Sequence, residues 1–212
     1  MLFLDYLQID TAATPPTVVE GTLAWDSGNG TAELGLAGGN VSLKIGEQQI
    51  TRVFNDTLQT MTKGQVVYIT GAQGNRVAVK LARANSELTS KDTIGLVAES
   101  ITAGAEGWII NAGSLYKLNT NSLTAGDTIY LSPTTAGAFT STKPVAPDHT
   151  VILGFVQRVS TTVGSIYIKV DNGYELDELH NVLIASPING DLLQYQTSGL
   201  WQNTNLLDGG NF

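Results

Sequence analysis

The side chains most often used in catalysis and metal binding are scarce in this chain. It has no cysteine and only two histidines, His149 and His180, which lie far apart in the sequence. A zinc site needs several nitrogen, sulfur or carboxylate ligands at characteristic spacings, and neither histidine has a second one at such a distance. The chain also lacks the Gly-x-Ser-x-Gly sequence that presents a nucleophilic serine in many hydrolases. We therefore expect no enzyme activity, no bound metal and no cofactor.

Other patterns contain residue types that bind ligands, but simpler structural roles explain them. The glycine-rich stretch Gly35–Asn40 lies between predicted strands and opens no helix, whereas phosphate-binding loops use the N–H groups at a helix N-terminus. We interpret it as a turn, because glycine readily adopts positive φ. The acidic stretch Glu175–Glu178 fits the first turn of a short helix, where carboxylates are favoured. Asp171, Asn172 and Asp177 supply too few alternating oxygen ligands for a calcium loop.

The tryptophans have neighbours typical of packing rather than of a binding platform. Trp25 precedes Asp26 in an alternating strand, which favours a core side chain followed by an aspartate that caps a turn. The alternative for this pair is a carbohydrate-binding surface. Trp201 follows a Ser-Gly turn, and we expect it to pair across a hairpin with Leu193 or Tyr195. Such an aromatic cross-strand pair contributes about 0.5–1 kcal/mol.

The charge balance bears on the possible partners. The 212 residues include 11 Lys and Arg against 19 Asp and Glu, giving a net charge of -8, and only 14% of residues are charged. Binding to nucleic acid or to an anionic membrane relies on the opposite sign, so neither is expected as a partner. No stretch approaches the roughly 20 apolar residues that span a membrane. We therefore also expect no membrane insertion.

Strand and turn patterns dominate the chain. The apolar runs are short, rich in β-branched residues and separated by glycine, asparagine or aspartate. We predict an all-β, Gly/Thr-rich β-sandwich or barrel. The exception is Glu175–Leu183, predicted as a short C-terminal helix that places Leu176, Leu179, Val182 and Leu183 on one apolar face and precedes a hairpin.

An internal repeat is visible in the middle of the chain. Each copy begins with a glycine turn and an alternating strand that carries a tyrosine, Tyr68 or Tyr130, and the two tyrosines lie 62 residues apart. Two later blocks match at offsets that shrink to 59 and 57. We predict two similar β units with equivalent positions for the two tyrosines. The matching blocks are Lys63–Thr70 with Ala125–Ser132, Ile94–Val97 with Leu153–Val156, and Gly107–Ile110 with Gly164–Tyr167.

These features divide the chain into three sections. Residues 1–19 form an apolar arm that ends in a Thr-Pro-Pro-Thr hinge, because prolines deny ladder hydrogen bonds and hold the backbone extended. Residues 20–172 form the β domain, with the two similar units at about 60–115 and 122–172. Residues 173–212 hold the predicted helix, a hairpin and a tail, and we expect this section to mediate oligomerisation.

Several motifs resemble fibre and tail- or head-appendage proteins of tailed bacteriophages. They include Glu20-Gly-Thr-Leu-Ala-Trp-Asp26, Gly38-Gly-Asn-Val41 and, near the end, Gly190-Asp-Leu-Leu-Gln-Tyr195 with Leu200-Trp-Gln-Asn203. The likeness extends over roughly residues 20–203. It implies a structural protein located in the virion that forms homotrimers and attaches to the particle, with a role in host attachment.

The sequence thus predicts a virion structural protein, a trimeric fibre or a tail or neck appendage component, that acts by assembly. Two alternatives remain open: a capsid decoration protein that stabilises the head, and a module that binds host-surface glycan. The expected partners are other copies of the chain and other tail, neck or capsid proteins. The residues expected to dock on a particle protein are Leu2, Phe3, Leu4, Leu7 and Ile9; those expected at the oligomer interface are Leu176, Leu179, Val182, Leu183, Leu193, Tyr195 and Trp201.

Overall fold

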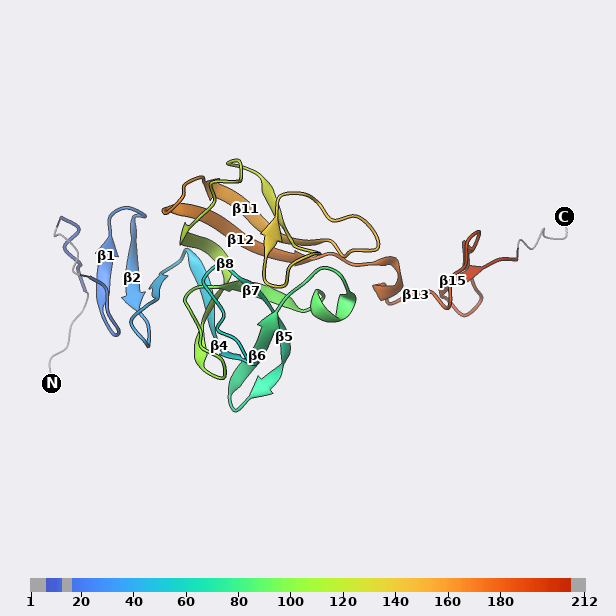
Figure 1. The fold of residues 1–212 in the computed structure, drawn as a ribbon, viewed down its shortest axis with the longest axis horizontal. Coiled ribbons are helices and arrows are strands. Elements are labelled where there is room, and N and C mark those ends of the chain that lie inside the picture. Colours follow the sequence, from blue (N-terminus) through green and yellow to red (C-terminus); the bar gives the residue numbers. More distant parts are fainter. Residues whose placement is uncertain (1–6, 13–16, 207–212) are drawn as a thin grey trace. The chain divides into compact units, whose positions relative to one another are not determined.

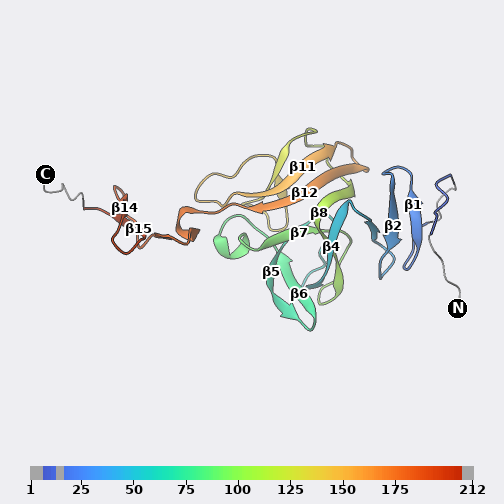
Figure 2. The same ribbon diagram turned by 180° about the vertical axis from the view of Figure 1, so that it is seen from behind.

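A computed structural model of the chain describes residues 7–12 and 17–206, and its regular structure is almost entirely β-strand (Figures 1 and 2). The all-β prediction is therefore confirmed. The chain divides into two compact units, residues 1–172 and 173–212, and this boundary coincides with the one expected from the sequence. No helix in the described ranges is both long and apolar enough to cross a membrane.

The centre of the first unit is a closed five-stranded barrel. Its strands are β4 (Gln48–Asn55), β5 (Val66–Gln73), β6 (Arg76–Leu81), β7 (Thr93–Val97) and the long β8 (Glu106–Leu118). They pair in the order β8-β4-β6-β5-β7, and β7 returns to pair with β8. The pairing of β4 with β6 is parallel and the others are antiparallel. Seven buried side chains, among them Val53, Met61 and Ile109, form one continuous core cluster from these strands and their loops.

The sheet continues past β8 as an open extension. Here β12 (Gly164–Asn172) pairs with the C-terminal half of β8, followed by β11 (Val151–Arg158), β9 (Thr128–Leu131) and the two-residue β10 (Phe139–Thr140). In Figure 1 these strands run from yellow to orange beside the cyan and green barrel strands. A second and larger core cluster lies between the extension and the outer face of the barrel. One strand, β8, thus belongs to both halves.

The predicted repeat is visible in the strand pairing. Strands β5, β6, β7 and β8 of the first half correspond to β9, β10, β11 and β12 of the second. Residues at the predicted offsets lie opposite one another in the same register, with a register shift at the same place in each half. Tyr68 and Tyr130 are both half-buried and both follow a fully buried residue. The cross-strand rows are Val66, Leu96 and Ile110 in the first half and Thr128, Phe155 and Tyr167 in the second.

A small antiparallel sheet precedes the barrel. It contains β1 (Leu23–Asp26), β2 (Thr31–Gly35) and β3 (Ser42–Lys44), in that order. Two hydrogen bonds attach it to β8: the Trp108 indole donates to the Ala37 carbonyl at 3.0 Å, and the Tyr116 hydroxyl donates to Asn29 at 3.0 Å. Trp108 also packs against the larger core cluster.

The second unit has a three-stranded sheet of its own. Strand β15 (Trp201–Thr204) lies between β13 (Val182–Leu183), to which it is parallel, and β14 (Leu192–Tyr195), to which it is antiparallel. The predicted hairpin is present as β14 and β15. Tyr195 lies opposite Trp201 with ring centroids 5.4 Å apart, so the expected aromatic pair forms with Tyr195.

The predicted helix over Glu175–Leu183 is wrong. Only a three-residue 3-10 turn, η2 (Leu176–Glu178), forms, closed by a capping box between the first and last acidic residues of Glu175–Glu178. Leu179 already has extended backbone angles, and the chain continues into β13. A nine-residue helix is too short to be stable without a packing surface, and the β-branched Val182 instead joins β15. The other helical piece in the described ranges, η1 (Glu87–Thr89), is equally short.

Candidate functional site

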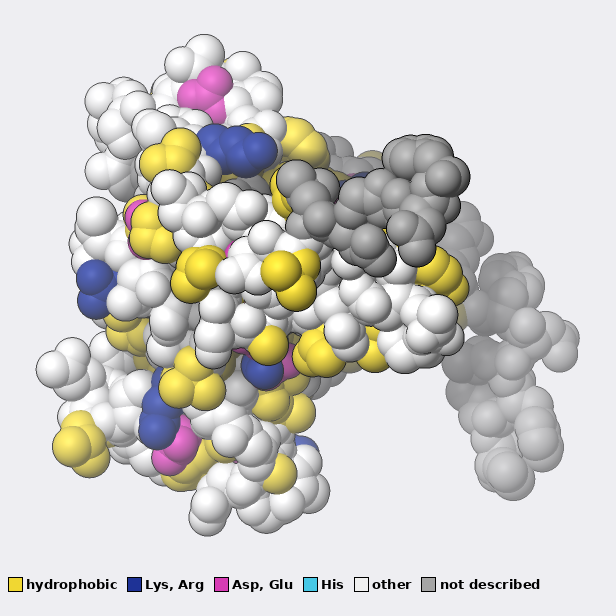
Figure 3. Space-filling model, turned by 90° about the vertical axis from the view of Figure 1, so that its right-hand side faces the viewer, with side chains coloured by type: hydrophobic (Ala, Val, Ile, Leu, Met, Phe, Trp, Pro, Cys, Tyr) yellow, Lys and Arg dark blue, Asp and Glu magenta, His cyan; other side chains and the backbone are white. Residues whose placement is uncertain are grey.

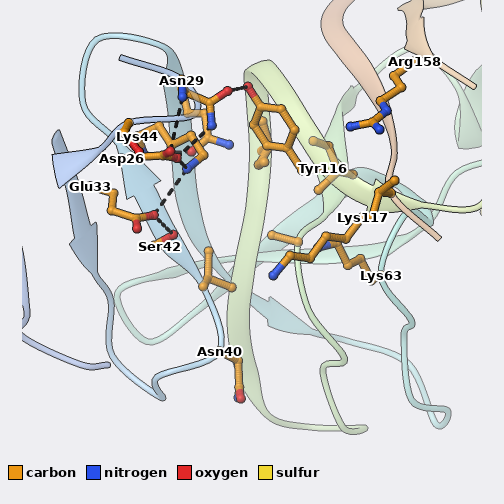
Figure 4. Close-up of a pocket in the computed structure, with 17 residues that line it drawn as sticks. Asp26, Asn29, Glu33, Asn40, Ser42, Lys44, Lys63, Tyr116, Lys117 and Arg158 are labelled. Atoms are coloured by element: carbon orange, nitrogen blue, oxygen red, sulfur yellow. Dashed lines mark hydrogen bonds and ion pairs between the residues drawn. The ribbon is translucent and has the colours of Figure 1, made fainter. Parts of the chain in front are cut away.

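A polar cavity of about 460 Å³ lies in the first unit between the small N-terminal sheet and the large sheet (Figure 4). Strands β1, β2 and β3 supply one wall, and β8, the end of β11 and the turn before β5 supply the other. Hydroxyl, amide and charged side chains contribute much of the lining, with Asn40 and Ser42 among them.

The wall on the small sheet is organised around one buried lysine. Lys44 pairs with Asp26 on the neighbouring turn and with Glu33 at 3.3 Å, and the Ser42 hydroxyl donates to Glu33 at 2.8 Å. Asp26 ends β1, Glu33 lies in β2, and Ser42 and Lys44 are both in β3. The ammonium group therefore joins all three strands and is itself neutralised.

Asp26 also caps the turn between β1 and β2. Its carboxylate accepts backbone N–H groups of Gly28 at 2.9 Å and Asn29 at 3.2 Å, which is the capping role expected from the sequence. Burial acts to raise the pKa of Asp26, but hydrogen bonds from Lys44 and Asn29 outweigh it and lower the pKa to about 2. The carboxylate is therefore ionised at any pH above that value.

Tyr116 connects the two walls. Besides its hydrogen bond to Asn29, its ring faces Lys44, whose ammonium nitrogen lies 5.6 Å from the ring centroid. This is within the range of a cation–π interaction. The aromatic ring thus fixes the position of the lysine cluster relative to β8.

Three further cations reach the cavity from the opposite wall: Lys63, Lys117 and Arg158. Figure 4 shows Lys63 and Lys117 extending side by side into the opening, with Arg158 above them. All three side chains are exposed, and none forms an ion pair or side-chain hydrogen bond with any residue of 7–12 or 17–206. Partial desolvation, followed by repulsion from Lys117, lowers the pKa of Lys63 from its ordinary value of 10.5.

Lys117 occupies an unusual backbone position. Its φ is +60°, which is uncommon for a residue other than glycine. It lies at a bulge, because Tyr116 pairs with Ser165 and the next pair along the strand joins Leu118 to Gly164. In the other pairing of β8, with β4, the register shift lies between Gln49 and Ile50, and the pairs from Ile50 to Phe54 follow without interruption. Lys117 is therefore the extra residue of β8 at this step of its pairing with β12, and bulges of this kind re-aim side chains.

Sequence reasoning missed this cluster because its members lie far apart along the chain. Lys63 precedes β5, Lys117 is in β8 and Arg158 ends β11, so no spacing motif connects them. In the described part of the chain, no three histidine or carboxylate side chains converge in a way that would hold a metal ion.

The residues expected at an oligomer interface lie in the second unit, and the structure brings most of them together. Five of them line a shallow apolar cavity of about 300 Å³, and a neighbouring apolar cavity of about 370 Å³ includes Ile188 and Leu192. They converge through the η2 turn and the small sheet rather than through a helix face. Leu183 and Tyr195 are exposed outside the smaller cavity. The five that line it are Leu176, Leu179, Val182, Leu193 and Trp201.

The structure describes only two of the five residues that we expect to dock on a particle protein. Leu2, Phe3 and Leu4 lie outside the described residues. Leu7 is exposed and Ile9 is half-buried.

No known protein family has a model that matches this chain, and no curated protein matches it.

Proposed function

We propose that this chain is a structural subunit of a tailed-bacteriophage particle and acts by assembly, with residues 173–212 joining three copies around a common axis. The location in a particle and the threefold symmetry are inferred from the resemblance of its motifs to fibre and appendage proteins. The observation that carries the proposal is the lack of buried residues in the second unit. Not one residue of 173–206 is buried, although the unit contains the η2 turn, a three-stranded sheet and many apolar side chains.

A unit of this size without a core is unstable by itself. Domains below about 40 residues usually need disulfides, metals or oligomerisation, because they bury too little surface. This chain has no cysteine. Association of identical units would instead cover the apolar side chains that line the two cavities, each worth on the order of 1.5–3 kcal/mol when fully buried.

The small sheet is also open at both edges. Strands β13 and β14 each have a neighbour on one side only, and every residue of β14 is exposed. Unpaired strand edges are ready sites for pairing with another chain. Assembly would therefore satisfy hydrogen-bonding groups as well as cover apolar surface.

The low charge of the molecule is compatible with extensive subunit contacts. Charged side chains are few on the face shown in Figure 3, where uncharged groups predominate. Burying unpaired charge at an interface is costly, so surfaces that assemble are depleted of it.

Light scattering on the full chain tests the proposal. At micromolar concentration we expect a mass of three times 22.4 kDa. Leu193→Asp places a charge in the smaller apolar cavity and should shift the protein to monomer. The matched control is Leu58→Asp, because Leu58 is 98% exposed in the first unit and should leave the trimer intact. A monomeric or dimeric wild-type protein would contradict the threefold assembly.

The role in the particle is tested separately. We propose that the apolar arm, including the exposed Leu7, docks on another particle protein. Deleting residues 1–12 should leave the oligomer folded while abolishing its incorporation into particles. Normal incorporation would overturn the docking role, and loss of folding would instead assign the arm to its own subunit. Quantitative mass spectrometry of purified particles gives the copy number: tens of copies or fewer fit an appendage, whereas hundreds would indicate a head decoration protein.

A further inference from the structure

We infer that the cavity lined by Lys63, Lys117 and Arg158 binds an oxyanion, namely a phosphate or carboxylate group carried by a small polar ligand. The cavity belongs wholly to the first unit, so this inference does not depend on oligomerisation or on attachment to a particle.

The lining of the cavity carries excess positive charge. Five cations of the described chain, Lys44, Arg52, Arg76, Lys80 and Lys91, form ion pairs with carboxylates. The three exposed cations of the cavity do not, and they line a single opening from one wall. Counting Lys44, Asp26 and Glu33, the lining has four cations and two carboxylates. It therefore carries two excess positive charges in a chain whose net charge is -8.

The arrangement of Lys63 and Lys117 in the cavity is unfavourable without a ligand. Lys63 and Lys117 lie close enough for repulsion to lower the pKa of Lys63. Lys117 also adopts a positive φ, a conformation that costs a non-glycine residue free energy. Strain and like-charge contact at one place are typical of ligand-binding sites, where the ligand compensates for both.

The pairing of β8 with β4 provides a contrast. From Ile50–Ile110 to Phe54–Glu106 it continues without a bulge, and its one register shift lies between Gln49 and Ile50, where no cation is placed beside Lys63. The bulge at Lys117 is therefore specific to the pairing of β8 with β12. Its effect is to place a second ammonium group beside Lys63, as Figure 4 shows.

The remaining lining limits the ligand. A volume of about 460 Å³ lies within the range of small-molecule sites, and Asn40, Ser42 and Tyr116 offer hydrogen-bonding groups around the cations. Ammonium and guanidinium groups form their strongest hydrogen bonds with phosphate and carboxylate oxygens. The negative charge of the whole chain repels extended polyanions, which favours a compact ligand with one acidic group.

Calorimetric titration of the full-length protein at low ionic strength tests the inference, with inorganic phosphate, glucuronate and glucose as probes. We expect phosphate, glucuronate or both to bind, and glucose to bind far more weakly. Lys63→Gln and Lys117→Gln should each weaken binding about tenfold, the effect of losing one charge-assisted hydrogen bond. The matched control is Lys143→Gln, an exposed lysine outside the cavity. Thermal melting of each variant verifies that it is folded.

The probes also separate the possible sources of the anion. Binding of phosphate alone supports an inorganic or phosphate-bearing ligand, and binding of glucuronate alone supports a carboxylate on a sugar-sized ligand. Equal binding of glucose and glucuronate would overturn the inference, as would undiminished binding by the Lys63→Gln, Lys117→Gln double variant. Absence of binding by phosphate and glucuronate at millimolar concentration would overturn it as well.

Discussion

The two halves of the repeat share a strand register but differ in how they are covered. In the cross-strand row of the first half, Leu96 is completely buried, because the second half packs over it. The corresponding row of the second half includes Phe155 and Tyr167, which are 42% and 43% exposed. The first half also closes into a barrel through pairing of β4 with β6, whereas the second ends at the two-residue β10 and stays open.

This difference shows that register and burial are separate consequences of the sequence. The register follows from local turns and alternation, and both halves contain them. Burial depends on what lies opposite a face, and only the first half has a neighbour on both sides of its sheet. The aromatic residues of the open face therefore perform a different role from the aliphatic residues that occupy the same positions in the first half.

The largest expected effect comes from truncating equivalent positions in this row. Leu96→Ala should lower the free energy of unfolding by about 3–4 kcal/mol, because it leaves a cavity in the larger core cluster. Phe155→Ala should cost less than about 1 kcal/mol, since its side chain is already in contact with water. Denaturant unfolding monitored by tryptophan fluorescence measures both. Equal losses would refute the difference in coverage.

Gly95 and Gly154 occupy equivalent positions in the two halves, so their substitution compares the halves at a shared close backbone contact. A Cβ at Gly95 would lie 2.2 Å from the Ile110 carbonyl oxygen, and one at Gly154 would lie 1.9 Å from the Tyr167 carbonyl oxygen. Each alanine substitution should therefore destabilise the fold by about 2–3 kcal/mol. Gly154 in addition has a φ of +143°, so Gly154→Ala should exceed Gly95→Ala by about 1 kcal/mol. The same denaturation experiment decides, and a smaller loss for Gly154→Ala would contradict the assigned strain.

Substitution of Lys117, the extra residue of the bulge, should raise the stability rather than lower it. Lys117→Gly should raise stability by about 0.5–1 kcal/mol, because glycine adopts a φ of +60° without strain and the repulsion of Lys63 disappears. The control is Lys169→Gly, a strand position in β12, which should lower stability by a similar amount. Thermal denaturation compares the two, and destabilisation by Lys117→Gly would show that the bulge has a structural function.

The smallest effect is a pH-dependent one at Lys63. Its pKa in the folded protein is lower than the ordinary value of 10.5, so the unfolded chain binds more protons between these two values and stability rises with pH there. At pH values below the pKa of the folded protein, the charged form of Lys63 is less favourable in the folded chain than in the unfolded chain, and this lowers the stability. Lys63→Gln should therefore stabilise the protein by about 0.3 kcal/mol at neutral pH, an effect limited by solvent exposure. The gain should vanish above about pH 10.5, and melting curves across this range test it. A gain that persists at high pH would exclude the charge as its cause.

The sequence was sufficient to predict the all-β class, the division near residue 172 and the repeat. These depend on local information: glycine turns, alternating strands and their spacing. It was not sufficient at Glu175–Leu183, where a helical spacing of leucines competes with β-branched Val182 and an available partner strand. For a segment of nine residues the helix and strand alternatives differ little in intrinsic stability, so the contact with β15 decided the outcome.

The basic cavity depended on tertiary structure alone. The amino-acid order determines that Lys63, Lys117 and Arg158 stand at a turn, in a long strand and at a strand end. Their convergence requires β8 to serve both halves of the repeat. The cavity that they line also requires the N-terminal sheet to dock against Tyr116. Those are long-range pairings whose partners are chosen by packing and hydrogen bonding across the folded molecule, and no local pattern encodes them.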